Sequence, residues 1–324
     1  MKLKTYFAPA LAVAALVLTA CGSAETPATE TPTTPAASAA AETDAAETTT
    51  RSITHDSGTT EISGEPKNVV ALEFSFVDSL LLLGTDPVGI ADDEDASRIA
   101  QLAGSDLEYT SVGTRAEPNQ EVIASLKPDL IIADTDRHSE VYAALSEIAP
   151  TIVLNSREGS YQDMKDNTVI IADALGKKDD GVAAVAAHEK AMEEIASKLP
   201  ADEARTVQLA TARADLLRIH TSSSFVGSVM EAVGAKVAVK SDEAYEDASL
   251  ERIAEVNPDV LFIASDVDTP ITDTWKDNPV WTGMKAVSTD QVHEADRNLF
   301  TRFRGLKTAE TIGQQIVDTL NETR

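Results

Sequence analysis

One short pattern occurs twice in the chain, and it constrains the fold more than any other feature. The sequences EVIASLKPDLIIAD (121–134) and ERIAEVNPDVLFIASD (251–266) each begin with glutamate, show helical spacing and reach Pro-Asp before an apolar run. Proline stands seven positions after the glutamate in both copies, at Pro128 and Pro258. Proline ends a helix, and a continuous apolar run is typical of a buried parallel strand. The repeated helix-to-strand unit therefore predicts two lobes with related α/β folds.

Further apolar runs extend this pattern and support two parallel α/β lobes. They lie at residues 68–73, 87–92, 151–155 and 206–212. Between the lobes, apolar residues recur at helical spacing from Tyr161 until Gly176. We therefore predict Rossmann-like lobes at 52–157 and 179–324, joined by a single long helix at 158–178. A ligand cleft is expected between the lobes, because clefts between domains are favoured ligand sites.

The N-terminal part of the chain is predicted to be a targeting segment and a tether. Residues 1–20 combine Lys2 and Lys4 with an apolar run that is too short for a comfortable membrane span and is typical of a secretory signal. The run ends in LTAC, and Cys21 is the only cysteine of the sequence. This pattern resembles the lipobox of bacterial lipoproteins and predicts lipidation of Cys21; the alternative is an ordinary signal followed by an incidental thiol. Residues 21–51 lack the apolar side chains of a core, so we expect a disordered tether.

The net charge of the chain excludes several kinds of partner. The formal net charge is −27, and removal of the signal with its two lysines leaves −29. Such an acidic protein has no general affinity for nucleic acid, and its surface is not expected to bind anionic lipid. Contact with the membrane is therefore expected through the lipid anchor only.

One segment near the C-terminus is rich in arginine, although the chain as a whole is acidic. The sequence EADRNLFTRFRG holds Arg297, Arg302 and Arg304, with Phe300 and Phe303 among them. A guanidinium is always charged and meets a carboxylate with a planar fork of donors. One interpretation is a solvated surface segment paired to nearby carboxylates. The other interpretation, which we favour, is a binding site for an anion.

Four longer motifs narrow the class of protein. They are GEPKNVVALEFSFVDSLLLLGTDPVGIADD, SVGTRAEPNQEVIASLKPDLIIADTDRH, SFVGSVMEAVGA and RNLFTRFRGL. With the lipobox and tether, they make the chain resemble the class III substrate-binding lipoproteins of iron-siderophore ABC importers, and most of all the iron(III)-dicitrate and staphyloferrin A type. The resemblance implies capture of a ferric carboxylate-type siderophore at the outer face of the cell membrane and its delivery to an importer. It implies no cofactor, since iron is bound only as the chelate.

The resemblance also implies roles for individual residues. The positions that match ligand-binding residues of the family are Arg297, Arg302, Arg304, Arg98, Arg115, His220 and Tyr245. The alternative for Arg98 and Arg115 is a salt bridge with nearby carboxylates, and for His220 a structural role. Tyr245 is expected on a mobile loop. Weaker matches are Arg137 and His138, which could line or brace the cleft, and Arg213, which is one position out of step.

Glu121 and Glu251 open the two repeated units, one in each lobe. The resemblance implies that they dock the protein, expected to be a monomer, onto two permease subunits. Two like charges held at a fixed separation can orient a rigid body on a two-fold-related receptor. The simpler alternative is a favourable charge in the first turn of a helix.

Other functions agree less well with the sequence. Direct metal binding needs converging ligands, whereas the five histidines are scattered at His55, His138, His188, His220 and His293. The serines near His220 are not part of a GxSxG elbow, so we expect no hydrolase and no other enzyme. A catecholate or hydroxamate siderophore in the same fold stays open, as does a surface adhesin without a small ligand.

Overall fold

The computed structural model describes residues 49–323 of the chain. The predicted signal at 1–20, the lipidation site Cys21 and nearly all of the predicted tether lie outside the described residues. Among the helices of residues 49–323, none is both long enough and apolar enough to cross a membrane.

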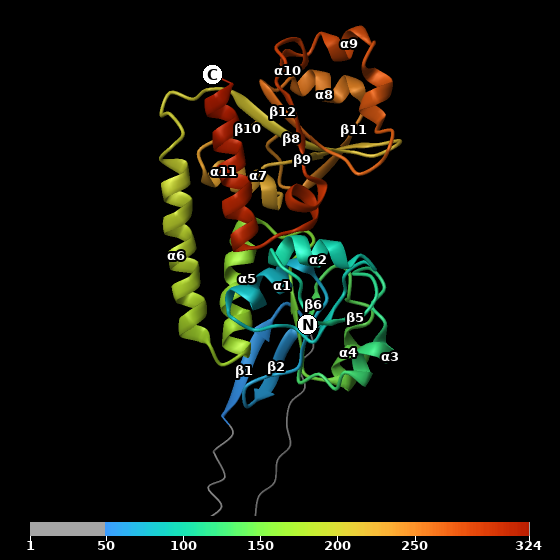
Figure 1. The fold of residues 1–324 in the computed structure, drawn as a ribbon, viewed down its shortest axis with the longest axis vertical. Coiled ribbons are helices and arrows are strands. Elements are labelled where there is room, and N and C mark those ends of the chain that lie inside the picture. The colour runs from blue at the N-terminus through green and yellow to red at the C-terminus, as the bar shows by residue number, and fades with distance from the viewer. Residues whose placement is uncertain (1–48, 324) are drawn as a thin grey trace, which may run out of the picture. The chain divides into compact units, whose positions relative to one another are not determined.

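A parallel five-stranded sheet forms the centre of the N-terminal lobe, drawn in blue and green in Figure 1. The strand order is β5-β4-β3-β6-β7, with β3 (Val69–Ala71), β4 (Gly89–Ile90), β5 (Thr110–Ser111), β6 (Leu130–Asp134) and β7 (Thr151–Leu154). The lobe's helices are α1 (Phe74–Leu82), α2 (Ala96–Ala103), α3 (Gln120–Ser125) and α4 (Tyr142–Ile148). All residues of β3, β6 and β7 are buried, as expected of a parallel sheet covered on both faces. An antiparallel hairpin of β1 (Thr50–His55) and β2 (Gly58–Ser63) packs beside β7.

The C-terminal lobe contains a mixed sheet rather than the wholly parallel one that we expected. Its order is β11-β9-β8-β12-β13, with β10 pairing to β8. The strands are β8 (Thr206–Ala212), β9 (Leu217–His220), β10 (Lys236–Val237), β11 (Tyr245–Ala248), β12 (Val260–Ala264) and β13 (Val292–Ala295). The tight turn from β8 to β9, closed by the bond from Arg213 N to Leu216 O at 2.8 Å, makes this pair antiparallel.

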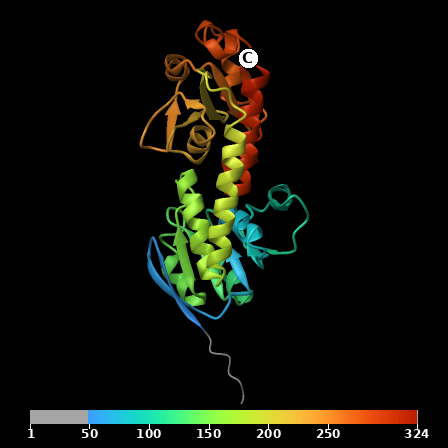
Figure 2. The ribbon, with the colours of Figure 1, turned by 90° about the vertical axis from the view of Figure 1, so that its left-hand side faces the viewer.

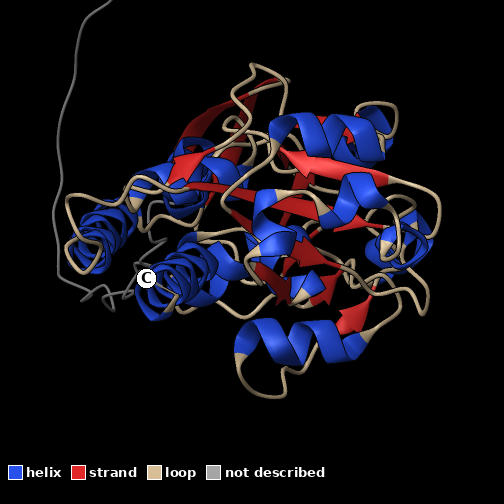
Figure 3. Ribbon diagram, turned by 90° about the horizontal axis from the view of Figure 1, so that it is seen from above, coloured by secondary structure: helices blue, strands red, loops and turns tan. Residues whose placement is uncertain are grey.

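Helices flank the strands of both lobes in the view from above (Figure 3). In the C-terminal lobe they are α7 (Phe225–Ala232), α8 (Leu250–Val256), η1 (Ile271–Trp275), α9 (Pro279–Thr282), α10 (Lys285–Ser288), the π-helical turn η2 (Asn298–Arg302) and α11 (Leu306–Glu322).

The repeated sequence unit occupies matching places in the two sheets. It forms α3 and β6 in one lobe and α8 and β12 in the other, and each strand pairs in parallel with two neighbours. The aspartate after each proline ties the start of the adjacent strand: Asp129 accepts a hydrogen bond from Asn68 N at 2.8 Å, and Asp259 accepts one from Thr206 N at 2.7 Å. The two related α/β lobes predicted from the repeat are thereby confirmed.

One long helix, α6 (Lys178–Ala196), joins the lobes, as Figures 1 and 2 show. It lies later in the chain than the range 158–178, which forms α5 (Tyr161–Ala174) and a turn. Helix α5 packs against α1 and β1 and lies beside α6 (Figure 2). The two helices approach closely because Gly181 has no side chain; a Cβ there would collide with Ala172.

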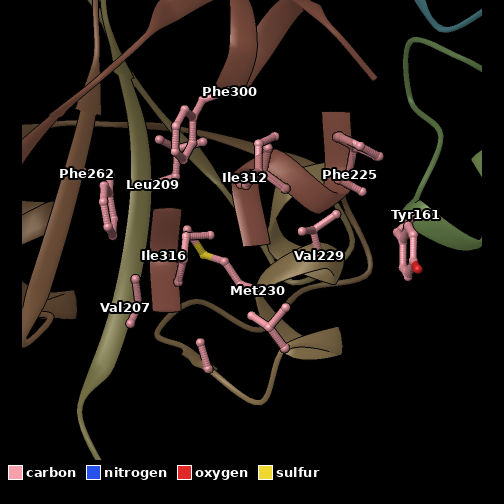
Figure 4. Packing of buried hydrophobic residues seen from close by; sticks show 14 of the residues in the cluster. Tyr161, Val207, Leu209, Phe225, Val229, Met230, Phe262, Phe300, Ile312 and Ile316 are labelled. Carbon is pink, nitrogen blue, oxygen red and sulfur yellow. The ribbon is translucent and has the colours of Figure 1, made fainter. Parts of the chain in front are cut away.

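Two aromatic residues fasten the C-terminal segment to both lobes. Phe300 lies in the C-terminal core with Leu209 and Phe262 (Figure 4), whereas Phe303 lies in the N-terminal core, 5.6 Å from Phe74 in an edge-to-face arrangement. The segment between them therefore has a fixed position relative to both cores.

A second contact between the lobes lies at the start of α11. The carboxylate of Asp78 in α1 accepts hydrogen bonds from Thr308 N and Oγ1, at 3.4 and 3.1 Å. Gly305 faces the same carboxylate with φ +135°, and a Cβ at this position would clash with Asp78. The close approach and the backbone conformation both require glycine here.

Candidate functional site

A cavity of about 350 Å³ opens between the lobes. It lies where the parallel strands of both sheets have their carboxyl ends, the usual ligand position in open α/β sheets. Of the 13 arginines in the sequence nine line it, and of the 14 lysines none does, counting lining residues within the described part of the chain. The lining residues are Asp93, Arg98, Arg115, Arg137, Arg157, Thr211, Arg213, Arg218, His220, Tyr245, Arg297, Thr301, Arg302 and Arg304.

The cavity brings together all but one of the predicted ligand-binding residues. Only His138 lies outside the lining. The structure adds Arg157 and Arg218, which sequence analysis missed. Contact of these residues with a ligand stays a prediction, whereas their convergence on one cavity is a property of the structure.

The arginine trio owes its position to the π-helical turn η2, which follows the edge strand β13. The aromatic residues within this segment point into the two cores, and the arginines face the cavity. Arg302 Nη1 donates to Asn298 Oδ1 at 2.9 Å inside the turn, which fixes its guanidinium. Single turns of π-helix are frequent at functional sites, because they displace the side chains that follow.

Arg304 is buried without an acidic partner. Arg304 is 7% exposed, and no carboxylate of residues 49–323 lies within ion-pair distance of its guanidinium. Among the described residues, its guanidinium donates only to Tyr245 Oη at 3.1 Å and to the carbonyl of Arg302 at 3.4 Å. The carboxylates of Glu73 and Asp134 act on this charge only from beyond ion-pair distance. A buried charge without a direct partner is costly, so this position is suited to an anion brought from outside.

Arg297 and Arg302 share one carboxylate, that of Asp266. Arg302 Nη2 bonds to it directly. Arg297 Nε lies 3.5 Å away and is buried, with no hydrogen-bond acceptor among residues 49–323. Burial, and then the neighbouring charge of Arg302, lower the pKa of Arg297 to about 10. The guanidinium still carries its charge at neutral pH, and its need for an acceptor is only partly met.

The arginines of the N-terminal lobe are paired with acids. Glu73 is fully buried between Arg115 Nη1 at 3.3 Å and Arg137 Nε at 2.6 Å. Arg115 also bonds to Asp93 at 2.7 Å and lies over the ring of Phe74, 4.1 Å from its centroid. The salt bridges expected for Arg115 as an alternative are therefore present, and the residue also lines the cavity; its contact with a ligand stays a prediction.

Arg98, like Arg115, both forms salt bridges and lines the cavity. It pairs with Asp93 at 3.1 Å and with Asp95 at 3.2 Å while lining the cavity. The salt bridges expected for Arg98 as an alternative are thus present.

His138 braces the site rather than lining it. It is fully buried; its Nδ1 accepts from Asp134 N at 2.8 Å and its Nε2 lies 2.9 Å from the carbonyl of Arg115. Burial lowers the pKa of His138, so the ring is neutral and can donate from one nitrogen while accepting at the other. Of the two roles left open for His138, bracing agrees with these contacts, because backbone groups already use both of its nitrogens.

His220 and Tyr245 lie side by side in the sheet. They are register partners of β9 and β11, with ring centroids 5.2 Å apart. The mobile loop expected for Tyr245 is therefore wrong; the residue belongs to a paired strand. Burial, followed by the charges of Arg297 and Arg304, lowers the pKa of His220 to about 3, so this histidine is neutral.

Arg218 and Arg157 could have been found by sequence rules. Arg218 stands two residues before His220 in β9, so strand alternation places the two side chains on one face. It bonds to Asp247 at 2.7 Å. Arg157 follows the carboxyl end of β7, the place where parallel sheets hold ligand residues, and pairs with Asp136 and Glu158.

Arg213 lines the cavity despite its unmatched register. It follows the carboxyl end of β8 and is exposed, and its guanidinium forms no ion pair with the described residues. Within residues 49–323, no group of three or more His, Cys, Asp and Glu could hold a metal ion.

The two repeated glutamates lie at the surface of the protein. Glu121 and Glu251 occupy the first turns of α3 and α8, and both are exposed. Neither lines the cavity. Their exposure agrees with docking and with a simple helix charge alike, so docking stays a prediction.

Comparisons with known proteins agree with this architecture. Residues 69–299 match the family model described as periplasmic binding protein. The chain is 49% identical to the Fe(3+)-citrate-binding protein YfmC of Bacillus subtilis over 268 residues, which is 83% of this chain and 85% of that protein. It is 37% identical to the Fe(3+) dicitrate-binding periplasmic protein FecB of Escherichia coli, over 82% of this chain and 89% of that protein.

A solved structure has the same fold. The Staphylococcus aureus protein SirA, crystallised with staphyloferrin B, superposes with a TM-score of 0.72 at 26% identity and covers 84% of this chain and 98% of that one.

Proposed function

We propose, since the chain belongs to the periplasmic binding protein family, that it captures a ferric carboxylate-type siderophore and delivers it to an ABC importer. Relatives named for binding Fe(3+)-citrate and Fe(3+) dicitrate support this function. The ligand would lie in the arginine-lined cavity between the lobes.

The observation that carries the proposal is the burial of Arg304 with no carboxylate of the described residues within ion-pair distance. Nine arginines around one cavity in a chain of net charge −27 reinforce it. Citrate-type chelates keep several carboxylates around ferric iron and remain anionic. The planar fork of arginine meets such carboxylates with two parallel hydrogen bonds, which lysine cannot do.

The expected affinity follows from these contacts. A hydrogen bond to a charged group contributes about 1.5–3 kcal/mol. Three or four such bonds in a partly desolvated cavity reach about −8 kcal/mol, which corresponds to a micromolar dissociation constant or better. A neutral hydroxamate chelate would leave the buried guanidiniums unpaired and should bind much more weakly.

Calorimetric titration with a panel of ferric chelates tests the proposal. Ferric citrate should bind tightly, a ferric catecholate less so, and ferrioxamine least. Tryptophan fluorescence is a poor reporter, because Trp275 and Trp281 pack against each other in the C-terminal core and do not line the cavity. Equal binding of ferrioxamine and ferric citrate would contradict the carboxylate assignment.

The lipid anchor is a separate part of the proposal and rests on the sequence alone. Cys21 would carry the lipid, with residues 21–51 as the tether to the outer face of the membrane. A Cys21→Ser variant should be released into the medium or retained as uncleaved precursor. Normal cleavage together with membrane retention would refute the anchor.

The remaining parts concern partners and chemistry. The protein would act as a monomer, bind without catalysis, and use Glu121 and Glu251 to meet two permease subunits. A weak and transient complex suits a protein that must load, dock and leave repeatedly.

A further inference from the structure

One carboxylate faces into the arginine-lined cavity. Among the described residues that line it, Asp93 is the only acidic one. In a site for a polyanion, a carboxylate on the wall should repel the ligand and weaken binding. A carboxylate at this position is therefore expected only if the ligand also carries a group that binds to it.

Asp93 is held too firmly to swing out of the way. It accepts hydrogen bonds from Arg115 N and Nε, each at 3.0 Å, and from Arg115 Nη2 at 2.7 Å, and Arg98 adds another at 3.1 Å. Arg115 is itself fixed by Glu73 and by the ring of Phe74. Displacing Asp93 would require this whole cluster to move.

The backbone around Asp93 is also unusual. Asp93 and Glu94 both adopt left-handed conformations, with φ of 58° and 59°. Such conformations cost energy for residues other than glycine and persist where the surrounding structure enforces them, often at ligand sites. Burial acts to raise the pKa of Asp93, but the hydrogen bonds and charge of Arg115 outweigh it and hold the pKa below its ordinary value. The carboxylate is therefore ionised at neutral pH.

The charge around the cavity is divided unequally between the lobes. In the N-terminal lobe, four of the lining arginines form salt bridges with five carboxylates. The arginines are Arg98, Arg115, Arg137 and Arg157, and the acids are Glu73, Asp93, Asp95, Asp136 and Glu158. In the C-terminal lobe, five arginines line the cavity, and within the described residues only two carboxylates form salt bridges with them. Arg218 pairs with Asp247, and Arg297 and Arg302 pair with Asp266, whereas Arg213 and Arg304 form no salt bridge with any described residue. The cavity thus has a strongly cationic wall opposite a charge-balanced wall that presents Asp93.

A ligand that fits both walls must itself be polarised. Its carboxylates would face the C-terminal lobe, and its other side would carry hydrogen-bond donors. Ferric iron supplies such donors, because a bound trivalent cation makes coordinated water or hydroxyl strongly acidic. A chelate that leaves part of the iron shell to water or hydroxyl has this pattern.

We propose that Asp93 is a specificity-determining residue that accepts a hydrogen bond from iron-bound water or hydroxyl on the chelate. It thereby selects chelates with an incompletely filled iron shell and turns their carboxylates toward Arg304 and its neighbours. The inference rests on the proposed function, since it assumes that a ferric carboxylate chelate occupies this cavity.

Two inert chromium(III) complexes test this selectivity without iron speciation. Tris-oxalato chromium(III) offers carboxylates all round and no donor, whereas bis-oxalato-diaqua chromium(III) replaces one oxalate by metal-bound water. The wild type and an Asp93→Asn variant would be titrated with both complexes by calorimetry. Asp93→Asn should shift the ratio of the two affinities by about tenfold toward the tris-oxalato complex, the scale of one charged hydrogen bond. The complexes carry charges of −3 and −1, so removing a negative charge would by itself strengthen the binding of both, and that of the tris-oxalato complex more. The proposal therefore also requires that Asp93→Asn weaken the binding of the diaqua complex itself.

A second variant and a matched control keep the test decisive if Asp93→Asn folds poorly. Arg98→Gln leaves Asp93 less neutralised and should weaken the tris-oxalato complex while it preserves or strengthens the binding of the diaqua complex; loss of positive charge alone would weaken both. Asp268→Asn removes an equal charge from an exposed residue without side-chain bonds to the cavity arginines and should leave the ratio unchanged.

Ferric citrate titrated in parallel separates the two claims. If ferric citrate fails to bind but the chromium complexes bind with the predicted shifts, the proposed function falls and the role of Asp93 stands. If ferric citrate binds but Asp93→Asn does not weaken the binding of the diaqua complex, the role of Asp93 is refuted. Binding of neither chromium complex to the wild type would also overturn it.

Discussion

The guanidinium of Arg304 donates to the hydroxyl of Tyr245 at 3.1 Å, and that hydroxyl donates in turn to the backbone carbonyl of Arg157 at 3.1 Å. This chain of bonds crosses the cavity from one lobe to the other. It orients a buried arginine without neutralising its charge. The site is therefore arranged in advance for an anion, rather than assembled by it.

Arg213 and Arg157 form a matched pair for testing the role of unpaired charge. Both line the cavity, but only Arg157 has carboxylate partners within the described residues. Arg213→Gln should weaken ferric citrate binding by about tenfold, the effect of losing one charged hydrogen bond. Arg157→Gln should weaken it less than about threefold, because Asp136 and Glu158 already offset its charge. An equal loss in both variants, measured by calorimetry, would refute the distinction between paired and unpaired arginines.

The contact of Asp78 with α11 should make stability depend on pH. Burial raises the pKa of Asp78 to about 6 from its ordinary value of 3.8. Between these values the folded protein binds more protons than the unfolded chain, so stability falls as pH rises through the window and then levels off. The contribution amounts to about 3 kcal/mol at most.

An Asp78→Asn variant isolates this contribution. Asparagine keeps an acceptor for Thr308 and cannot ionise, so its melting temperature should vary less between about pH 4 and pH 6 than that of the wild type. Identical pH profiles for the two proteins would show that Asp78 does not titrate in this range.

Ligand binding should close the lobes only slightly. Phe300 and Phe303 anchor the arginine segment in both cores, and α6 joins the lobes as one continuous helix. A wide hinge motion would have to break these contacts. Small-angle scattering of the free and ferric-citrate-loaded protein should therefore show a small contraction at most. A large change in the radius of gyration would be incompatible with the single-helix connection.

Glu121 and Glu251 should matter for transport and not for capture. Replacing both with alanine should leave chelate affinity and melting temperature nearly unchanged, because both side chains are exposed and neither lines the cavity. Iron uptake by cells should be abolished if the pair orients the protein on its permease. Replacement of the exposed Glu147 and Glu193 provides a control of equal charge that should preserve uptake. Normal transport by the Glu121/Glu251 variant would refute docking.

Much of the architecture could be read from the sequence because its signals are local. The proline of each repeat marks a helix end, and the apolar run marks a buried strand, so two α/β lobes follow from short segments. The role of the aspartate after each proline could not be predicted in this way, because it depends on a contact that is distant in the sequence. Asp129 and Asp259 bond to backbone groups more than fifty positions away, which no local pattern reveals.

The site was predictable where residue type and spacing carried the information. The concentration of arginine at Arg297, Arg302 and Arg304 indicated an anion site. Tyr245 was misplaced because a short polar strand such as β11 is defined by its pairing with β9, a contact distant in sequence. The sequence left open whether His138 lines or braces the cleft, because residue type alone does not distinguish a buried histidine that bonds to backbone from one that faces a ligand. The inward-facing Asp93 depends on left-handed backbone conformations that its residue type does not predict.

Calorimetric titration of ferric citrate into the wild type and an Arg304→Ala variant tests the central claim most directly. The wild type should bind with micromolar affinity or better, and the variant should lose about 1.5–3 kcal/mol of binding free energy. Arg252→Ala, which removes an arginine outside the cavity, is the control and should bind as the wild type does. Unchanged affinity in a folded Arg304→Ala protein would contradict the assignment of the cavity as a carboxylate-siderophore site.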